Sequence, residues 1–536
     1  MKVAFKTSFR HLLVLLPLLT MSPARGGEET PAKVDAKVFW DLSEQRTGRA
    51  NVVSIRLEAE TDPGVPVAVE LALPKGVRFA ADSAAKQQVT TWTRGTVIAN
   101  AVQTYFQFEK KPEKRLSATV SWRVEADAPV DAMAQATLSG ASPSAIPVRF
   151  DFRAPPQGIE AGKIPPPVPV KHDYHIGALY YPGWVPGEGS GWSLLDPYPE
   201  RRPALGYHDG RTVDTANWEI KWAAENGIDF FFYCWYLLPG KDPSVENLFL
   251  GQALHDGFMK SPFQDAMHFA ILWENAEGRA DSSPAFFREK LVPFWIAQYF
   301  KHPRQLLVDG KPVFGIYAVD AFVKAHGSTE NAAESIRFLR EEVAKAGLPG
   351  IWILGEHRYA AKESLQMMTQ LGLDASFAYC FGFPEPMTHA AAREAIIKTH
   401  DTQVAQVPLP VVPTVSASWD PQPWVEYIDY IWHKVPFWLD PPEFKQLVQS
   451  MKDRLDRRDE ANPLARRMLL IDNWNEYAEG HWVAPSRKEG FRYLNAIRDV
   501  FAPDAASRPN IMLEDAGLAP DESAYQEWKQ RMIQER

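Results

Sequence analysis

Two glutamates late in the chain, Glu476 and Glu479, are three residues apart. This spacing places two side chains on opposite faces of an extended strand but on one side of a helical turn, so we expect the chain to curl after Asn475. Two carboxyl groups on one side of a bound sugar can break a glycosidic bond, since one protonates the leaving oxygen and the other acts as base or nucleophile. Repulsion and partial burial would raise the pKa of one carboxyl group and leave the other ionised. The alternative is that both are solvated acids of a loop.

Further polar and aromatic side chains follow short apolar runs and are candidates for substrate binding. They are Tyr181, Trp184, Trp235, Tyr236, Trp273, Glu274, Asn275, Glu356, His357, Trp419, Trp474, Asn475 and Trp482. Aromatic faces stack on sugar rings, while carboxylates and amides bind hydroxyl groups, so this mixture favours a carbohydrate ligand. The alternatives are core packing for the aromatic residues, a structural carboxylate for Glu274 and a hydrogen-bonded structural role for His357. Asp420 and Asp472 are weaker candidates.

The apolar runs that precede these residues are expected to be strands of one barrel. Eight such runs lie at 176–181, 228–235, 268–273, 313–317, 351–355, 375–381, 411–416 and 468–473, and helical stretches lie at 215–226, 245–259, 284–300, 330–346, 362–371, 390–402, 443–457 and 489–501. Eight strand–helix units over about 330 residues predict an α/β fold, a (β/α)8 TIM barrel, rather than an open sheet. No glycine-rich dinucleotide or phosphate loop follows the first run. The active site of such a barrel lies at the carboxyl ends of the strands, where the candidates occur.

The rest of the chain predicts further parts on either side of the barrel. Residues 1–24 combine Lys2, Lys6 and Arg10 with a short apolar stretch, which is typical of a signal peptide and predicts an exported protein, periplasmic or extracellular. Alternating apolar residues and turn signals predict an all-β, immunoglobulin-like sandwich domain at 35–155. A proline-rich linker at 156–172 leads to the catalytic barrel at 173–505, and 506–536 form a C-terminal tail.

Composition narrows the partners and cofactors. The net charge of -9 is spread along the chain without a basic run, so nucleic acid is not an expected partner, and no segment after the signal is long and apolar enough to span a membrane. Cys234 and Cys380 fall on the second and sixth predicted strands, too far apart for a disulfide, so two free buried thiols are expected. The thirteen histidines are scattered, and neither a metal nor another cofactor is expected.

Several segments together resemble the glycoside hydrolase family 99-like group, which includes proteins called WbsX-type. The resemblance rests on 176–184, 221–223, 227–230, 273–275, 308–313 and 474–480, and it covers about residues 174–502. In the endo-acting α-mannosidases of this group, an Asn-Glu-x-x-Glu turn supplies both catalytic carboxylates. The resemblance therefore implies a retaining glycosidase, in which Glu476 is the base on the sugar 2-hydroxyl and forms a 1,2-anhydro intermediate. Glu479 would protonate the leaving group and then activate water.

The resemblance leaves the substrate open. Tyr477 and Ala478 stand where the mannosidases commonly carry Trp-His, and the N-terminal β-rich part is an addition, so the sugar and its linkage are not implied. The expected partner is a polysaccharide or glycan. The alternatives are a WbsX-type glycosyltransferase of polysaccharide biosynthesis, against which the signal sequence argues, and a non-catalytic carbohydrate-binding protein, against which the two glutamates argue.

Overall fold

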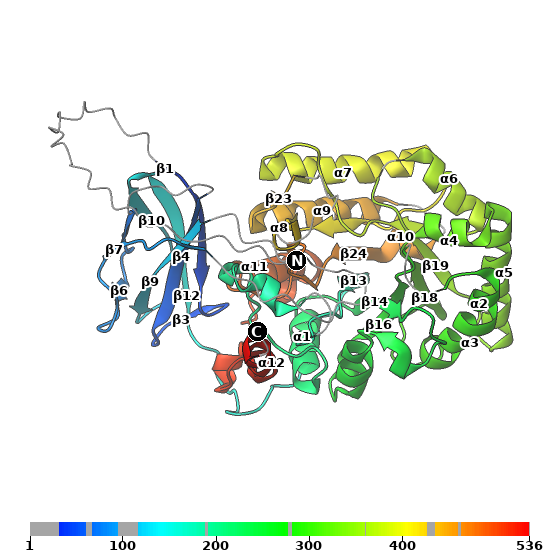
Figure 1. Cartoon of the computed structure of the whole chain (residues 1–536), viewed down its shortest axis with the longest axis horizontal. Helices are drawn as coiled ribbons and strands as arrows, with labels where there is room; N and C mark the ends of the chain where they lie inside the picture. The colour runs from blue at the N-terminus through cyan, green and yellow to red at the C-terminus, as the bar shows by residue number, and fades with distance from the viewer. Residues whose placement is uncertain are drawn as a thin grey trace, which may run out of the picture.

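The computed structural model describes residues 32–59, 67–94, 116–187, 191–276, 281–359, 361–425, 435–458 and 462–534. The predicted signal peptide at 1–24 lies outside these residues. Figure 1 shows a β-rich N-terminal part, coloured blue to cyan, beside a larger body of strands and helices.

The N-terminal part consists of two mainly antiparallel sheets over one apolar core. One sheet contains β2 (Asp35–Trp40), β4 (Asn51–Ala59), β9 (Leu116–Ala126) and β6 (Val77–Phe79), with β8 (Thr93–Arg94) beside β9; the other contains β3 (Gln45–Arg46), β12 (Ala145–Arg153), β10 (Val130–Ser139), β5 (Ala68–Leu71) and β7 (Gln87–Val89). Apart from these, β1 (Ala32–Lys33) pairs with β11 (Ala141–Ser142). Every second residue of β9 is buried, and Val120 and Trp122 join Val148 and Phe150 of the other sheet in the core. The immunoglobulin-like class stays a prediction.

Eight parallel strands form the predicted barrel. In order around the sheet they are β13 (His175–Tyr180), β14 (Phe230–Leu237), β16 (His268–Trp273), β18 (Lys311–Ile316), β19 (Trp352–Glu356), β20 (Ala375–Phe377), β21 (Thr414–Ser416) and β24 (Met468–Asp472). Pairing of β24 with β13 joins the last strand to the first, and a parallel bridge between Ser376 and Val411 joins the sixth to the seventh. The (β/α)8 barrel is therefore confirmed, with all eight strands in the predicted order.

Helices surround the barrel (Figure 1). They include α1 (Val213–Glu225), α4 (Val319–His326), α5 (Thr329–Lys345), α6 (Lys362–Leu371), α7 (His389–Gln406), α8 (Gln422–Val425), α9 (Pro441–Arg457), α10 (Pro463–Arg467), α11 (Arg492–Phe501) and α12 (Ser523–Gln534). Helix α9 begins where Asp440 accepts a hydrogen bond from the Glu443 N–H at 2.9 Å and Pro441 occupies the first turn. Its buried residues recur every three or four positions, so one stripe faces the barrel.

One predicted helix is wrong in detail. Residues 245–259 form η3 (Val245–Asn247), β15 (Leu248–Phe249), η4 (Ala253–Gly257) and η5 (Phe258–Lys260) instead of one helix. The physical reason is tertiary pairing, since Phe249 pairs with Tyr236 at the end of β14 and the chain turns through Leu250, whose φ is +60°. Residues 284–300 are helical but alternate between α2 (Pro284–Phe286), η7 (Phe287–Leu291), α3 (Val292–Trp295) and η8 (Ile296–Phe300).

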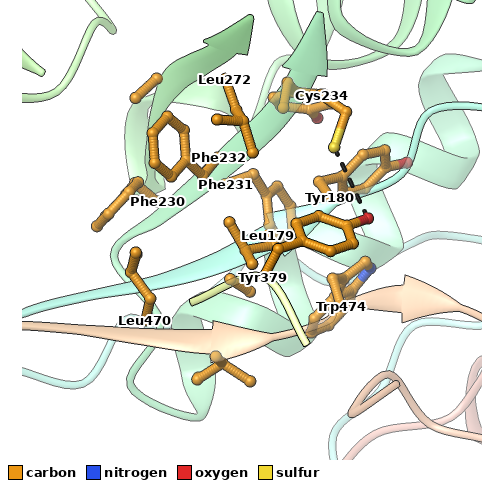
Figure 2. Close-up of a cluster of buried hydrophobic side chains, with 14 of the residues drawn as sticks. Leu179, Tyr180, Phe230, Phe231, Phe232, Cys234, Leu272, Tyr379, Leu470 and Trp474 are labelled. Carbon is orange, nitrogen blue, oxygen red and sulfur yellow. Dashed lines mark hydrogen bonds between the residues drawn. The ribbon is translucent and has the colours of Figure 1, made fainter. Parts of the chain in front are cut away.

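Large aromatic side chains of β14 fill the barrel (Figure 2). The Phe230 ring requires a glycine on the neighbouring strand β13, because a Cβ at Gly177 would lie 2.1 Å from this ring. Above these rings, the Cys234 thiol donates to the hydroxyl oxygen of Tyr379 at 3.9 Å, as the dashed line in Figure 2 marks. Cys234 and Cys380 are both free and buried, which confirms the predicted thiols. Among the described residues, no helix has the length and apolarity to cross a bilayer.

Candidate active site

The two glutamates lie on a hairpin that follows the last barrel strand. Strand β25 (Asn475–Glu476) pairs with β26 (His481–Trp482), and residues 477–480 form the turn between them. The predicted curl is thus present, one residue later than expected. The turn packs tightly: Gly480 has φ +74°, and a Cβ there would lie 2.4 Å from the carbonyl oxygen of Asp420, so only glycine fits.

The two carboxyl groups have different surroundings. Glu476 is only 4% exposed, whereas the side chain of Glu479 is 27% exposed. Burial raises the pKa of Glu476 well above its ordinary value, and the charge of Glu479 adds to the rise, while His481 and a hydrogen bond with Tyr379 oppose it. Glu476 therefore binds a proton strongly, and the more exposed Glu479 remains within reach of solvent or substrate.

A histidine connects Glu479 to a buried aspartate. His481 Nδ1 lies 2.8 Å from Asp472 Oδ1, and His481 Nε2 lies 3.2 Å from Glu479 Oε2. Burial disfavours the imidazolium ion, but Asp472 and Glu479 outweigh this effect and raise the pKa of His481 to about 10. Burial also raises the pKa of Asp472. The sequence analysis did not single out His481, because only the hairpin brings residues 472, 479 and 481 together.

Two asparagines at strand ends form hydrogen bonds with main-chain groups of a neighbouring segment. Asn475 accepts a hydrogen bond from the Tyr181 N–H at 2.8 Å and donates to the Tyr181 carbonyl at 2.9 Å. Asn275 makes the same pair of bonds with Ala318, at 2.8 and 2.9 Å. Both residues were predicted to bind substrate, but their amide groups are occupied in joining β24 to β13 and β16 to β18.

Most of the aromatic residues predicted to bind substrate are buried, which fits the alternative of core packing. Trp184, Trp235, Trp273, Trp419, Trp474 and Trp482 are all 4% exposed or less. Trp184, for example, stacks on Trp192 with ring centroids 4.2 Å apart. Their size makes burial the larger gain, which the sequence pattern at a strand end does not reveal. Tyr181 and Tyr236 remain partly exposed and are the aromatic candidates for contact with a ligand.

The indole N–H groups explain how two of these tryptophans are held. Trp235 donates to the Tyr299 hydroxyl at 2.8 Å, and Trp474 donates to Glu219 at 3.0 Å. Glu219 also accepts from the Tyr180 hydroxyl at 2.8 Å. Burial raises the pKa of Glu219 to about 7, and these two hydrogen bonds oppose the rise.

The remaining acidic and histidine candidates have protein partners. Glu356 accepts a hydrogen bond from Arg358 Nε at 2.8 Å. His357 is 7% exposed, burial lowers its pKa, and its Nε2 accepts the Ala361 N–H at 3.3 Å, which fits the structural alternative. Glu274 is buried at the end of β16, where its Oε1 accepts the Ala276 N–H at 3.3 Å.

Arg358 was not foreseen from the sequence. Its side chain is 9% exposed and donates to the Tyr317 hydroxyl at 2.9 Å and to the Cys380 sulfur at 3.0 Å. Together with Glu356 it joins the ends of β18, β19 and β20, across the barrel from β13. No sequence spacing marks this cluster, because its members come from three separate strands.

A buried arginine supports the turn that carries Glu479 from outside the barrel. Arg201, in η2 (Pro199–Arg201), donates to the Asp420 carboxylate at 2.5 Å and to the Tyr477 carbonyl at 3.2 Å. Asp420 follows β22 (Ser418–Trp419), which pairs with β23 (Phe437–Trp438), and its N–H donates to the Glu479 carbonyl at 2.8 Å. Asp420 was a weak sequence candidate, and its observed contacts are structural.

The N-terminal part reaches the residue next to Arg201. Lys37 of β2 lies 3.3 Å from Glu200, and Arg56 of β4 lies 3.8 Å from the same carboxylate. Both cations also pair with Glu58, Lys37 at 3.1 Å. A second buried contact joins Arg46 of β3 to Asp515 at 2.7 Å in η10 (Leu513–Ala516). The β-rich part is therefore attached to the barrel by buried and half-buried charges, close to the arginine that supports the turn carrying Glu479.

Among the described residues, no group of three or more His, Cys, Asp or Glu side chains is arranged to hold a metal ion.

Curated proteins from one bacterial species are similar to part of this chain. A protein called "Uncharacterized protein WxcX", from Xanthomonas campestris pv. campestris strain B100, is 24% identical over 339 residues, and the same protein of strain ATCC 33913 matches equally. The match covers 57% of this chain but only 44% of each relative, so the chain spans less than half the length of these curated relatives.

Solved structures also resemble the chain. A "Glycoside hydrolase-like protein" is 15% identical with a TM-score of 0.46 and covers 63% of this chain and 97% of its own. The GH99 endo-alpha-mannosidase from Bacteroides thetaiotaomicron is 14% identical with a TM-score of 0.44 and covers 63% and 100%. The family model "Glycosyltransferase WbsX" matches residues 197–497, which include the hairpin and its supports. The chain belongs to the WbsX family, as the sequence resemblance indicated.

Proposed function

We propose that the protein is a glycoside hydrolase that cleaves a polysaccharide or glycan, with Glu476 and Glu479 as its catalytic residues. The observation that carries the proposal is the pair itself: two carboxyl groups on one hairpin at the carboxyl end of a barrel strand, one buried and one 27% exposed. Different surroundings allow one carboxyl group to act as acid while the other acts as base.

The proposed reaction has two steps. In the first, Glu476 takes the proton of the sugar 2-hydroxyl as that oxygen attacks C1, and Glu479 gives its proton to the leaving oxygen as the C1–O bond breaks. In the second, water attacks C1 of the 1,2-anhydro sugar, Glu479 takes a proton from the water, and Glu476 returns its proton to the 2-oxygen. Burial raises the pKa of Glu476, so its carboxylate, in the ionised form that the first step requires, is a stronger base toward a hydroxyl group than an exposed glutamate.

The second candidate is a glycosyltransferase, which the description of the family model favours. We also propose that the protein is exported, on the strength of the signal-like residues 1–24. Export supports hydrolysis, because sugar-nucleotide donors are cytoplasmic.

One experiment separates these functions. Purified protein is incubated with a panel of polysaccharides, and release of reducing ends is measured; in parallel it receives sugar nucleotides and acceptors, and release of nucleoside diphosphate is measured. Reducing ends that disappear in Glu476→Gln and Glu479→Gln, but not in the exposed control Glu394→Gln, support hydrolysis. Nucleotide release without reducing ends would overturn it in favour of transfer, and saturable polymer binding without either product would favour a binding protein.

A further inference from the structure

His481 is held between two carboxylates at the centre of the proposed site. It begins β26, opposite Glu476 in the hairpin, and contacts Asp472 through Nδ1 at 2.8 Å and Glu479 through Nε2 at 3.2 Å. The side chains of His481 and Asp472 are 0% exposed. Each ring nitrogen thus faces a carboxyl oxygen that can accept a hydrogen bond from an N–H group.

Other buried histidines of the chain are satisfied differently. His326 pairs through Nδ1 with the Phe322 carbonyl at 2.8 Å, and His208 pairs with the Gly206 carbonyl at 3.0 Å. Each needs only one N–H and can be neutral. Two carboxylate partners on one ring are a costly arrangement in a protein interior, so a merely packed histidine would not require them.

The groups around the ring favour its charged form. Glu476 faces the ring across the hairpin, and the Tyr379 ring packs edge-on against the imidazole with centroids 5.8 Å apart. From the segments after β19 and β20, the charge of Arg358 acts on Asp472, and the buried thiol of Cys380 interacts with Asp472 and Glu479. The effect of Asp472 and Glu479 on the ring outweighs that of burial.

We propose that His481 is a positioning residue for Glu479: Asp472 anchors its Nδ1, and its Nε2–H holds Glu479 Oε2 in place. The inference rests on the proposed function. The 27% exposure of Glu479 leaves its carboxyl group able to exchange a proton with the substrate or with water. When Glu479 has given up its proton in the first step, the imidazolium stabilises the carboxylate that remains until water is deprotonated.

The test uses the full chain with His481→Gln and Asp472→Asn, and with His326→Gln as the control for loss of a buried histidine. The first readout does not need activity and is ¹⁵N NMR of the histidine side chains. The signal of His481 is identified as the one that is missing from the spectrum of His481→Gln. We expect the His481 ring to stay doubly protonated at pH 8 in the native protein. In Asp472→Asn, the ring should lose a proton at a lower pH than it does in the native protein. Should His481→Gln not fold, Asp472→Asn identifies the signal by its shift. A ring that titrates near pH 6.5 in the native protein would overturn the proposal.

The second readout is the pH profile of hydrolysis. We expect His481→Gln to lower kcat between about 10-fold and 100-fold, with little change in KM. This loss is smaller than the roughly 10²–10⁴-fold in rate that a positioned proton donor contributes, because Glu479 itself is kept. The alkaline limb of the profile should also move, because the variant lacks the ring nitrogen that lies 3.2 Å from Glu479 in the native protein. Unchanged kcat and limb would overturn the proposal. A native protein that hydrolyses nothing, yet keeps the charged ring, would contradict only the proposed function.

Discussion

Arg201 binds Asp420 twice, through Nη2 to the carboxylate at 2.5 Å and through Nη1 to the carbonyl at 2.8 Å. Because the N–H of Asp420 in turn donates to the carbonyl of Glu479, this pair fixes the main chain of the turn at residues 477–480. The side chain of Arg201 is 1% exposed, so its guanidinium group is held by these protein contacts and not by water.

We expect Arg201→Lys to lower turnover by roughly 10-fold or more, since a lysine cannot reproduce a two-point contact. Turnover is compared at a temperature well below unfolding, so that lost stability does not enter. Arg340→Lys is the matched control, because Arg340 pairs with Asp374 at 2.8 Å on the far side of the barrel. Equal turnover in the two variants would show that Arg201 does not position the turn.

The charges between the β-rich part and the barrel should matter for stability. Lys37→Met with Arg56→Met leaves Glu58 and Glu200 without these cations in a buried place, which costs about 3–5 kcal/mol. Thermal unfolding measures the loss. The control is Arg149→Met, whose exposed pair with Asp131 is worth about 0–1 kcal/mol. Similar melting temperatures for both variants would contradict the buried contact.

The two glutamates proposed as catalytic should differ with an activated substrate. Glu476→Gln and Glu479→Gln each lower turnover of the natural polymer by a factor of roughly 10² or more. With a leaving group that needs no proton, Glu479→Gln keeps much of its first step, whereas Glu476→Gln does not, because Glu476 activates the attacking oxygen. Release of the leaving group is followed before steady state. The reverse pattern would exchange the two roles.

Glu219 should make stability depend on pH. Its pKa is raised to about 7 in the folded protein from an ordinary 4.5, so its stabilising contribution is full below pH 4.5 and is lost as pH rises through 7. Glu219→Gln removes this loss, so the unfolding free energy of the variant relative to the native protein should rise by on the order of 3 kcal/mol from pH 4 to pH 8. Denaturant unfolding measures the change. A constant difference across this range would mean that Glu219 does not titrate there.

The cysteines should be reduced and unreactive. Burial raises the pKa of both Cys234 and Cys380, so alkylating reagents should modify them only after unfolding. Intact masses of native and reduced protein should agree. A native mass about 2 daltons lower would indicate a disulfide, which opposite strands of the barrel cannot form.

The barrel and its acidic hairpin were predictable because both depend on local patterns. Apolar runs ending in polar residues marked the strands, and the spacing of Glu476 and Glu479 marked the turn. The burial of the tryptophans was left open between substrate binding and core packing, since the sequence shows that a residue follows a strand but not whether the chain folds back over it. His481 and Arg201 could not be found at all, because their partners are defined by a hairpin and by a segment more than 200 residues away.

The two asparagine contacts have a consequence for how the protein can diversify. Asn475 and Asn275 recognise the peptide groups of Tyr181 and Ala318, and a peptide group is the same whatever side chain it carries. Any residue except proline at position 181 or 318 therefore still offers both groups that the asparagine binds. The joints between these strands are thus independent of the side chains at positions 181 and 318.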